Sequence, residues 1–212
     1  MVLSSEPPLA ASAANRGRPA YHVRMARRAL GTLRIIGGHH RSRLIHFDAE
    51  NGVRPTPDRV RQTVFDWLAP IIHGARVLDL FAGSGALGLE AASRGAHEVT
   101  FVESHRHAAA AIRDAVALLK LDAVRVVEQD ALGWLGGTAE SFDVVFLDPP
   151  YATNLLSEAL ARLPRCLTPG AMVYLEWPVG QPPAMPQGLV IHRERRAGKV
   201  CFALLKQEVL TP

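Results

Sequence analysis

From Gly74 onward the sequence alternates between short apolar runs and helical stretches, and this alternation restricts the fold more than any other feature. The apolar runs cover residues 76–81, 98–103, 124–129, 143–148 and 171–177. Stretches of helical character lie between them, at 86–94, 104–120, 131–135 and 154–163. Strands that are apolar along their length and separated by helices are typical of a parallel sheet covered on both faces. The sequence therefore predicts an α/β fold with a mostly parallel sheet.

Both ends of the chain depart from this alternation. The C-terminal runs LVIHRER and KVCFALLKQ flank RAG, which predicts an antiparallel hairpin closing the sheet. Near the N-terminus, LRII and RSRLIHF surround GGHH and predict a smaller hairpin.

A helix is expected between the N-terminal hairpin and the sheet. Thr56 is expected to cap it and Pro57 to occupy its first position. Apolar residues then recur at helical spacing and predict its buried face, with Trp67 expected in the core. These residues are Val60, Val64, Trp67, Leu68 and Ile71.

Charge is distributed unevenly along the chain. Residues 1–61 contain eleven Arg, no Lys and four acidic residues, a balance of +7, whereas the remainder has 13 basic and 16 acidic residues, a balance of −3. A basic end on a mildly acidic body suggests a polyanionic partner, although a solvated Arg-rich tail is the alternative. Residues 1–32 are expected to be mainly a disordered basic tail, because the first 24 residues are rich in Ala, Ser, Pro and Arg and lack apolar periodicity.

A glycine-rich loop follows the first strand of the parallel unit. Gly83, Gly85 and Gly88 spell G-x-G-x-x-G at the start of a helix, and Glu103 ends the next strand. Such glycines allow a ligand to approach the backbone, and the acidic residue can accept hydrogen bonds from a ribose diol. The pattern predicts an adenosine-containing ligand, with a tight turn that binds nothing as the alternative.

Asp79 bears on the choice between two such ligands. It lies at the end of the strand, four residues before Gly83, where its charge would repel the pyrophosphate of a dinucleotide. A carboxylate there suits a ligand with an ammonium or sulfonium group. The sequence thus favours S-adenosylmethionine over a dinucleotide.

The stretch VVFLDPPYATN ends the fourth strand of the unit on Asp148, Pro149, Pro150 and Tyr151. Ligands of open α/β sheets bind at the carboxyl ends of the strands, where the strand order reverses. If the order reverses after the third strand, this turn lies beside the glycine loop. Asp148 and a backbone carbonyl would then accept hydrogen bonds from a planar NH2 group, and Tyr151 would offer a stacking face. A plain strand-terminating turn is the alternative.

These motifs resemble those of a known family. DLFAGSG with DPPY is similar to class I methyltransferases that act on planar amino nitrogens, with a Rossmann-like seven-stranded sheet. RIIGGHHRSR, RPTPDRVRQTVFDWLAP and DLFAGSGALGLEAASRGA resemble the RsmD family, bacterial methyltransferases of a guanine exocyclic amine in 16S ribosomal RNA. The similarity runs from about Leu33 to the C-terminus.

The resemblance implies roles for individual residues. Asp148, Pro149, Pro150 and Tyr151 are implied as catalytic residues. The implied S-adenosylmethionine-binding residues are Asp79, Gly83, Ser84, Gly85, Glu103, Asp130, Ala131, Arg54 and Thr56, the last with helix capping as an alternative role.

The N-terminal hairpin is the expected RNA-binding element, occupying residues 33–55 before a methyltransferase domain at 56–212. Its Arg34, Arg41 and Arg43 would contact phosphates beside a target base that has been swung out of its helix. His39 and His40 lie at its turn, but no acid or Cys completes a ligand set, so no metal is expected.

Alternative functions remain open on sequence alone. They are methylation of DNA adenine or protein glutamine, a dinucleotide-dependent oxidoreductase, and a non-catalytic RNA-binding module. No apolar run reaches the ~20 residues that span a bilayer, and Cys166 and Cys201 are expected to be thiols. Such thiols fit a reducing cytoplasm. The protein is also expected to be a monomer, acting on rRNA that is free or in an assembling ribosomal particle.

Overall fold

The computed structural model describes residues 30–48, 55–151 and 153–208. Arg54 and almost all of the expected N-terminal tail lie outside these ranges. None of the helices in the described ranges has the length and apolar character needed to cross a bilayer.

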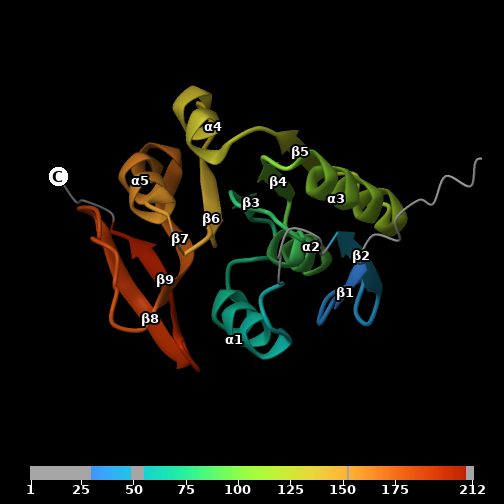
Figure 1. Ribbon diagram of the computed structural model, residues 1–212, viewed down its shortest axis with the longest axis horizontal. Helices are drawn as coiled ribbons and strands as arrows, with labels where there is room; N and C mark the ends of the chain where they lie inside the picture. The colour runs from blue at the N-terminus through green and yellow to red at the C-terminus, as the bar shows by residue number, and fades with distance from the viewer. Residues whose placement is uncertain (1–29, 49–54, 152, 209–212) are drawn as a thin grey trace, which may run out of the picture.

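A seven-stranded sheet forms the centre of the molecule, in the order β5-β4-β3-β6-β7-β9-β8 (Figure 1). The first five strands in this order are parallel, and β9 and β8 are antiparallel. The strands are β3 (Arg76–Asp79), β4 (Glu98–Glu103), β5 (Val124–Glu128), β6 (Phe142–Leu147), β7 (Leu167–Pro178), β8 (Leu189–Ala197) and β9 (Val200–Gln207). The predicted mostly parallel sheet with an antiparallel C-terminal hairpin is confirmed.

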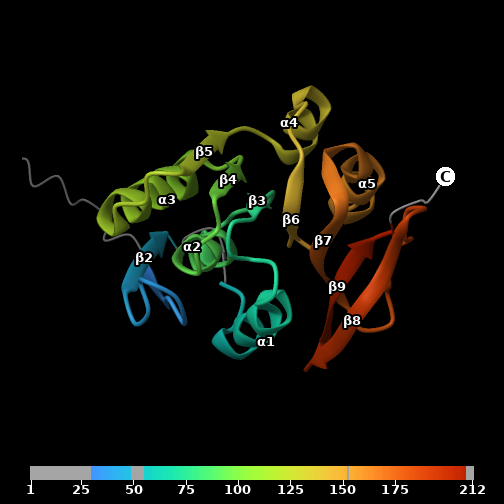
Figure 2. The same ribbon diagram turned by 180° about the vertical axis from the view of Figure 1, so that it is seen from behind.

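Helices cover both faces of this sheet (Figures 1 and 2). One face packs against α1 (Asp58–Leu68), α2 (Ala86–Ser93) and α3 (Arg106–Leu119). The other packs against α4 (Ala131–Gly137), α5 (Leu155–Arg162) and the short 3-10 helix η1 (Leu163–Cys166). Each face has its own cluster of buried side chains, which explains why the central strands are apolar at successive positions.

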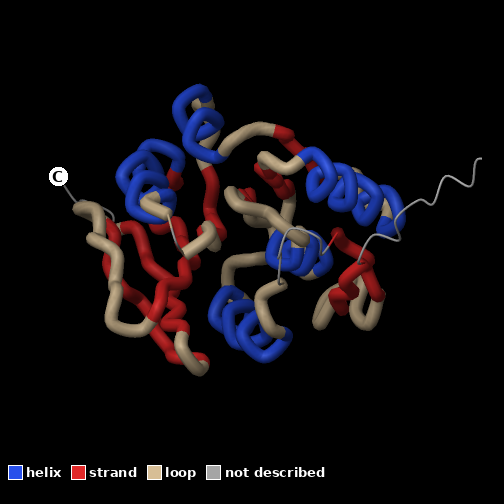
Figure 3. Tube along the Cα trace, in the orientation of Figure 1, coloured by secondary structure: helices blue, strands red, loops and turns tan. Residues whose placement is uncertain are grey.

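The N-terminal hairpin is a separate two-stranded sheet, β1 (Leu30–Arg34) and β2 (Leu44–Asp48) (Figure 3). Its first strand begins three residues before the expected boundary at Leu33. Its turn is held on α2 by the buried carboxylate of Glu90, which accepts hydrogen bonds from the backbone N–H groups of Ile36 and Gly37, each at 2.8 Å. The Arg94 guanidinium pairs with the same carboxylate at 2.7 Å. The turn is therefore fixed to the domain that carries the sheet.

The start of α1 differs from the prediction. Pro57, not Thr56, is the N-cap, and no side chain caps the helix, so the capping prediction for Thr56 is wrong. Thr56 is instead buried in the wall of the main cavity. Trp67 packs against the core as expected but is only half-buried, and Phe65 is the fully buried aromatic residue of α1. The Trp67 ring stacks on Phe202 of β9, with ring centroids 5.5 Å apart.

Candidate active site

The main cavity lies at the carboxyl ends of the parallel strands, where the strand order reverses. β3 pairs with β4 on one side and with β6 on the other, so the segments that follow β3 and β6 meet there. The cavity has a volume of about 860 Å³. Its lining includes Thr56, Asp79, Gly83, Ser84, Glu103, His105, Asp130, Ala131, Asp148, Pro149, Pro150, Tyr151, Glu176, Ala197, Val200 and Phe202.

Asp79 is the last residue of β3 and is buried in the cavity wall. Its Oδ2 accepts a hydrogen bond of 2.9 Å from the backbone N–H of Gly88. A side chain at position 88 would place its Cβ 2.3 Å from the Phe101 ring, so only glycine lets α2 approach the strands this closely. Burial, chiefly, raises the pKa of Asp79 to about 7, with Glu103 contributing in the same direction.

Glu103 ends β4 and faces the same cavity. Its Oε2 accepts the backbone N–H of Gly83 at 2.7 Å, and its Oε1 accepts that of His105 at 2.7 Å. The His105 ring Nδ1 also lies 3.1 Å from Oε1, so Oε2, which has a single partner, is the oxygen best able to accept a further hydrogen bond from a ligand hydroxyl. The glycine loop and Glu103 are thus held together before any ligand binds.

Asp130 and Ala131 line the cavity at the start of α4. Asp130 is the N-cap of this helix, and its Oδ1 accepts the backbone N–H of Gly133 at 2.7 Å. Asp130 therefore has a structural role in addition to its place in the cavity wall.

The DPPY turn forms the wall that faces β7. Tyr151 donates its hydroxyl hydrogen bond to Glu176 Oε2 at 2.8 Å, and the Tyr174 hydroxyl donates to Glu176 Oε1. Burial, followed by the nearby charges of Glu176 and Asp79, raises the pKa of Asp148 well above its usual range. Burial and Glu176 likewise raise the pKa of the Tyr151 hydroxyl, which therefore stays protonated. Tyr151 is 48 % exposed, so its ring remains accessible from solvent.

The charge of the cavity is one-sided. Five acidic residues line it, and among the described lining residues there is no Lys or Arg. The acidic lining residues are Asp79, Glu103, Asp130, Asp148 and Glu176. Such a lining suits a cationic ligand and opposes a pyrophosphate. In the described ranges, no group of three or more His, Cys, Asp or Glu residues is arranged to hold a metal ion.

The structure brings together most of the residues predicted for the site. Gly85 is not among the residues that line the cavity: it adopts a left-handed conformation at the N-cap of α2, on the side of Ile112 and Leu89. Arg54 lies outside the described residues. The predicted RNA-binding residues Arg34, Arg41 and Arg43 are exposed on the N-terminal hairpin.

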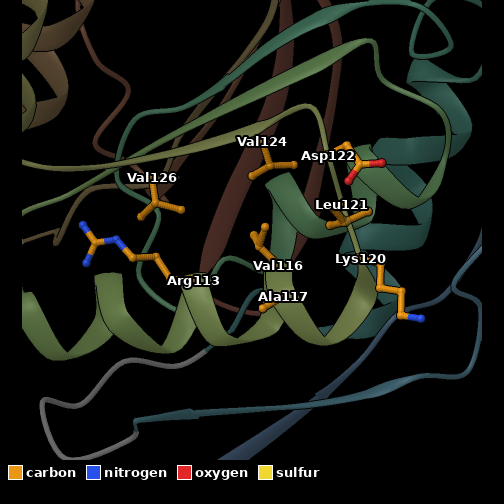
Figure 4. Close-up of a pocket in the computed structure, with 8 residues that line it drawn as sticks. All are labelled: Arg113, Val116, Ala117, Lys120, Leu121, Asp122, Val124 and Val126. Carbon is orange, nitrogen blue, oxygen red and sulfur yellow. The ribbon is translucent and has the colours of Figure 1, made fainter.

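A second, smaller hollow of about 300 Å³ lies between α3 and β5 (Figure 4). Its floor is aliphatic, and Arg113 and Lys120 extend in opposite directions from α3 at its ends. It contains none of the residues predicted for the site.

Comparisons with known proteins agree with this geometry. The model of a family described as "Conserved hypothetical protein 95", which is the RsmD family, matches residues 33–206. The ribosomal RNA small subunit methyltransferase D of Escherichia coli is 41% identical over 181 residues, covering 84% of this chain and 91% of that protein. The Haemophilus influenzae protein of the same name is 39% identical, covering 83% and 94%.

The chain belongs to the RsmD family.

Solved structures agree with this membership. A proposed methyltransferase of Escherichia coli superposes with a TM-score of 0.77 at 40% identity, covering 84% of this chain and 99% of that one. A 16S rRNA guanine-N2 methyltransferase of Thermus thermophilus, solved with AdoMet and guanosine, has a TM-score of 0.64 at 20% identity, covering 85% and 50%. At that identity the second likeness shows the fold alone, and it is the class I methyltransferase fold.

Two functional residues of this RsmD-family member were not predicted from the sequence. Glu176 faces the cavity opposite the DPPY turn, and Glu90 holds the turn of the N-terminal hairpin. Both are acidic residues inside otherwise apolar runs, MVYLEW and ALGLEAA. Because charged side chains are rarely buried without partners, that placement was the available signal.

Proposed function

We infer that the protein transfers a methyl group from S-adenosylmethionine to the exocyclic amine of a guanine in small-subunit (16S) rRNA. The observation that carries this inference is the acidic cavity, free of Lys and Arg among its described lining residues, beside the DPPY turn. The names of the RsmD-family relatives point to methyl transfer to small-subunit ribosomal RNA.

The residues of one half of the cavity fit the cofactor. This cofactor half consists of Asp79, Gly83, Ser84, Glu103 and Asp130 with Ala131. When bound, S-adenosylmethionine supplies a methyl group on a positively charged sulfur, already activated for transfer. Asp79 would balance positive charge, the free acceptor sites of Glu103 would take ribose hydroxyls, and Asp130 with Ala131 would face the adenine.

The base half consists of Asp148, Pro149, Pro150, Tyr151 and Glu176. The Asp148 carboxylate and the Pro149 carbonyl would accept hydrogen bonds from the target amine and so hold its lone pair in line with the methyl group. Positioning of this kind can contribute about 7–11 kcal/mol at best. A positive charge bound beside Asp79 favours the ionised form of Asp148, which is the form that accepts from the amine. The proton released by the amine can pass to water.

Guanine is the favoured base for a physical reason. Its Watson–Crick edge presents adjacent N–H donors, which one carboxylate can span, whereas adenine presents a donor beside an acceptor. The base would stack on the exposed ring of Tyr151 after leaving its helix.

The alternatives fit the structure less well. The acidic lining opposes the pyrophosphate of a dinucleotide, which argues against an oxidoreductase. Activity on duplex DNA or on a protein glutamine is a further outcome that a substrate screen separates. We further propose that the protein acts as a cytoplasmic monomer on rRNA, free or in an assembling particle.

The direct test is methyl transfer from labelled cofactor to small ribosomal subunits and to naked 16S rRNA, both from cells lacking the enzyme. The expected product is a guanine methylated on its exocyclic amine, identified by nucleoside analysis. Methylation of adenine, of duplex DNA or of protein would contradict the assignment, as would calorimetry showing tight NADH binding without S-adenosylmethionine binding.

The binding of RNA by the N-terminal hairpin is tested separately. Replacing Arg34, Arg41 and Arg43 with Ala should lower the log–log salt slope of RNA binding by about 0.7–0.9 for each phosphate that the protein no longer neutralises. The affinity for the cofactor should not change. An unchanged salt slope would reduce these arginines to a solvated surface.

A further inference from the structure

The C-terminal hairpin carries a positive charge that the balance of the whole chain conceals. Although the chain beyond residue 61 is net acidic, residues 189–207 contain five basic residues and one acidic residue, Glu194. The basic residues are Arg193, Arg195, Arg196, Lys199 and Lys206. A second basic element therefore exists in the part of the chain whose overall balance is acidic.

The strand register places two of these arginines on the side of the main cavity. Arg195 lies opposite Phe202, and Ala197 lies opposite Val200. Directly opposed residues of antiparallel strands share one face of the sheet, and so do residues two positions apart along a strand. Because Ala197, Val200 and Phe202 all line the cavity, Arg195 projects from the face that forms its rim.

Arg193 shares this face, opposite Leu204. Leu204 and Phe202 belong to the buried cluster beneath α1, which confirms which face of the sheet this is. Arg196, one residue further along β8, lies opposite Cys201 and points to the other face. The same strand thus presents arginines to both faces, and Arg193 and Arg195 are on the cavity side.

These side chains are available to a ligand. Arg193, Arg195 and Arg196 are exposed on β8, which is the last strand of the sheet. Within the described ranges, none of the three forms an ion pair. Arg196 donates one hydrogen bond to the backbone oxygen of Gly198 in the hairpin turn.

The two basic hairpins lie on opposite sides of α1 (Figures 1 and 2). The β1–β2 hairpin is beside α2 and α3, and the β8–β9 hairpin is at the other end of the molecule. The cavity lies between the two hairpins: its lining includes residues from Thr56, just before α1, to Ala197 on β8, and no described residue of the β1–β2 hairpin. An RNA strand that delivers a base to the cavity would extend its sugar–phosphate backbone away from that base in both directions.

We propose that Arg193 and Arg195 bind RNA phosphates on the β8 side of the cavity, so that the RNA is held by both basic hairpins with the target base between them. This inference rests on the proposed function. A nucleotide that swings out of its helix needs its flanking backbone fixed, and phosphate contacts from Arg supply orientation without reading sequence.

A second copy of the chain is the competing occupant of this edge. Successive charged residues on an edge strand disfavour pairing with another strand. β8 carries Arg193, Glu194, Arg195 and Arg196 in succession, and its pairing with β9 shifts register between Ile191 and Arg193. The sequence of β8 therefore favours the polyanion over the strand of a second copy.

The test compares two neighbouring exposed arginines on opposite faces of β8, of which Arg196 also donates a hydrogen bond to the hairpin turn. Arg195→Ala and Arg196→Ala each remove one positive charge from β8 in the full-length protein. Binding to 16S rRNA is measured across salt concentrations, and methyl transfer is measured with small ribosomal subunits lacking the modification. Arg195→Ala should lower the log–log salt slope by about 0.7–0.9 and raise KM for subunits, whereas Arg196→Ala should do neither.

The double variant Arg193→Ala/Arg195→Ala enlarges the effect. Its salt slope should fall by about 1.4–1.8, twice the change for one phosphate. The kcat at saturating subunits, the Kd for S-adenosylmethionine and the Tm should match the parent, because neither arginine contacts the cofactor half of the cavity.

Three results would separate the RNA contact at β8 from its alternatives. Equal effects of Arg195→Ala and Arg196→Ala, or parent salt slopes in the double variant, would overturn this inference and leave the methyl transfer intact. A dimeric parent that Arg195→Ala makes monomeric, with RNA affinity retained, would assign the edge to a second copy. Parent protein that binds rRNA with the expected salt slopes yet transfers no methyl group would overturn the proposed function and support the RNA surface.

Discussion

The two halves of the cavity are held in place by different kinds of contact. In the cofactor half, carboxylates accept hydrogen bonds from backbone N–H groups: Asp79 from Gly88, and Asp130 from Gly133. In the base half, the contacts join side chains, since Glu176 accepts from the hydroxyls of Tyr151 and Tyr174.

This difference has a consequence for function. Backbone donors are fixed by the loops that carry them, so the cofactor half is preorganised for its ligand. In the base half, the Asp148 carboxylate accepts no hydrogen bond from any residue in the described part of the chain, and Tyr151 is held through a side-chain hydrogen bond to Glu176. We therefore expect substitutions in the two halves to affect different measurements.

The largest effect is expected in the base half, from Asp148→Ala. Turnover should fall by about a hundredfold or more, the scale for losing one hydrogen-bonding group that acts in the transition state. The Kd for S-adenosylmethionine and the Tm should stay close to those of the parent, because the substitution removes no hydrogen bond between residues that the structure describes. Single-turnover methyl transfer with calorimetry of the cofactor would measure both.

The control is Asp148→Asn, which should be less damaging because the amide keeps one acceptor while turning a donor toward the base. Methylation by Asp148→Ala at the parent rate would mean that the base half has been placed wrongly. Loss of cofactor binding in the same variant would remove the distinction between the halves.

The next largest effect concerns the pH dependence of cofactor binding. Burial raises the pKa of Asp79 to about 7, so the free protein carries this group mostly neutral at pH 5. A cationic ligand prefers the ionised form, so affinity should rise with pH by up to about tenfold per unit until pH 7 and then level off. Calorimetry from pH 5 to 8 would measure this profile.

Asp79→Asn should flatten the profile and weaken binding at pH 8, because the amide carries no charge at any pH. Asp130→Asn is the matched control in the same half, and it should keep the slope. A parent profile that is flat, or that falls toward pH 7, would argue against a cation beside Asp79.

A smaller effect separates the ring of Tyr151 from its hydroxyl. Tyr151→Ala should raise KM for small ribosomal subunits by about 5- to 150-fold, the equivalent of about 1–3 kcal/mol of base stacking. Tyr151→Phe keeps the ring and loses only the hydrogen bond to Glu176, which Tyr174 still contacts, so its KM should rise a few-fold at most. If the two variants are equally impaired, the hydroxyl is essential and stacking is the wrong explanation.

The smallest effect is one of stability, in the cofactor half. Asp130→Ala removes the side-chain cap of α4 and should lower the free energy of unfolding by about 1 kcal/mol. Asp130→Asn keeps an oxygen acceptor for the Gly133 N–H and should lose much less. Denaturant unfolding of the cofactor-free protein would compare them, and equal losses would show that the cap does not hold this helix.

Much of the fold could be predicted from sequence because its signals are local. The alternation of apolar strands with helices indicated the parallel sheet, and the reversal after the third strand, on which the predicted place of the DPPY turn was conditional, is present, since β6 pairs with β3. One local signal was overridden by the tertiary structure. Thr56 had the sequence context of a helix cap, but its side chain is buried in the cavity wall and Pro57 is the N-cap of the helix.

The sequence by itself determined the cofactor half of the cavity, because its contacts join residues close together in the chain or at the ends of successive strands. The spacing from Asp79 to Gly88 and from Asp130 to Gly133 sets those hydrogen bonds once a strand is followed by a helix. Only the tertiary structure decided the partners across strands, such as Tyr151 with Glu176, 25 positions away, and the cavity side of β8 for Arg195. The physical reason is that strand order and register determine which distant side chains meet, and a shift of one residue turns a side chain to the opposite face of the sheet.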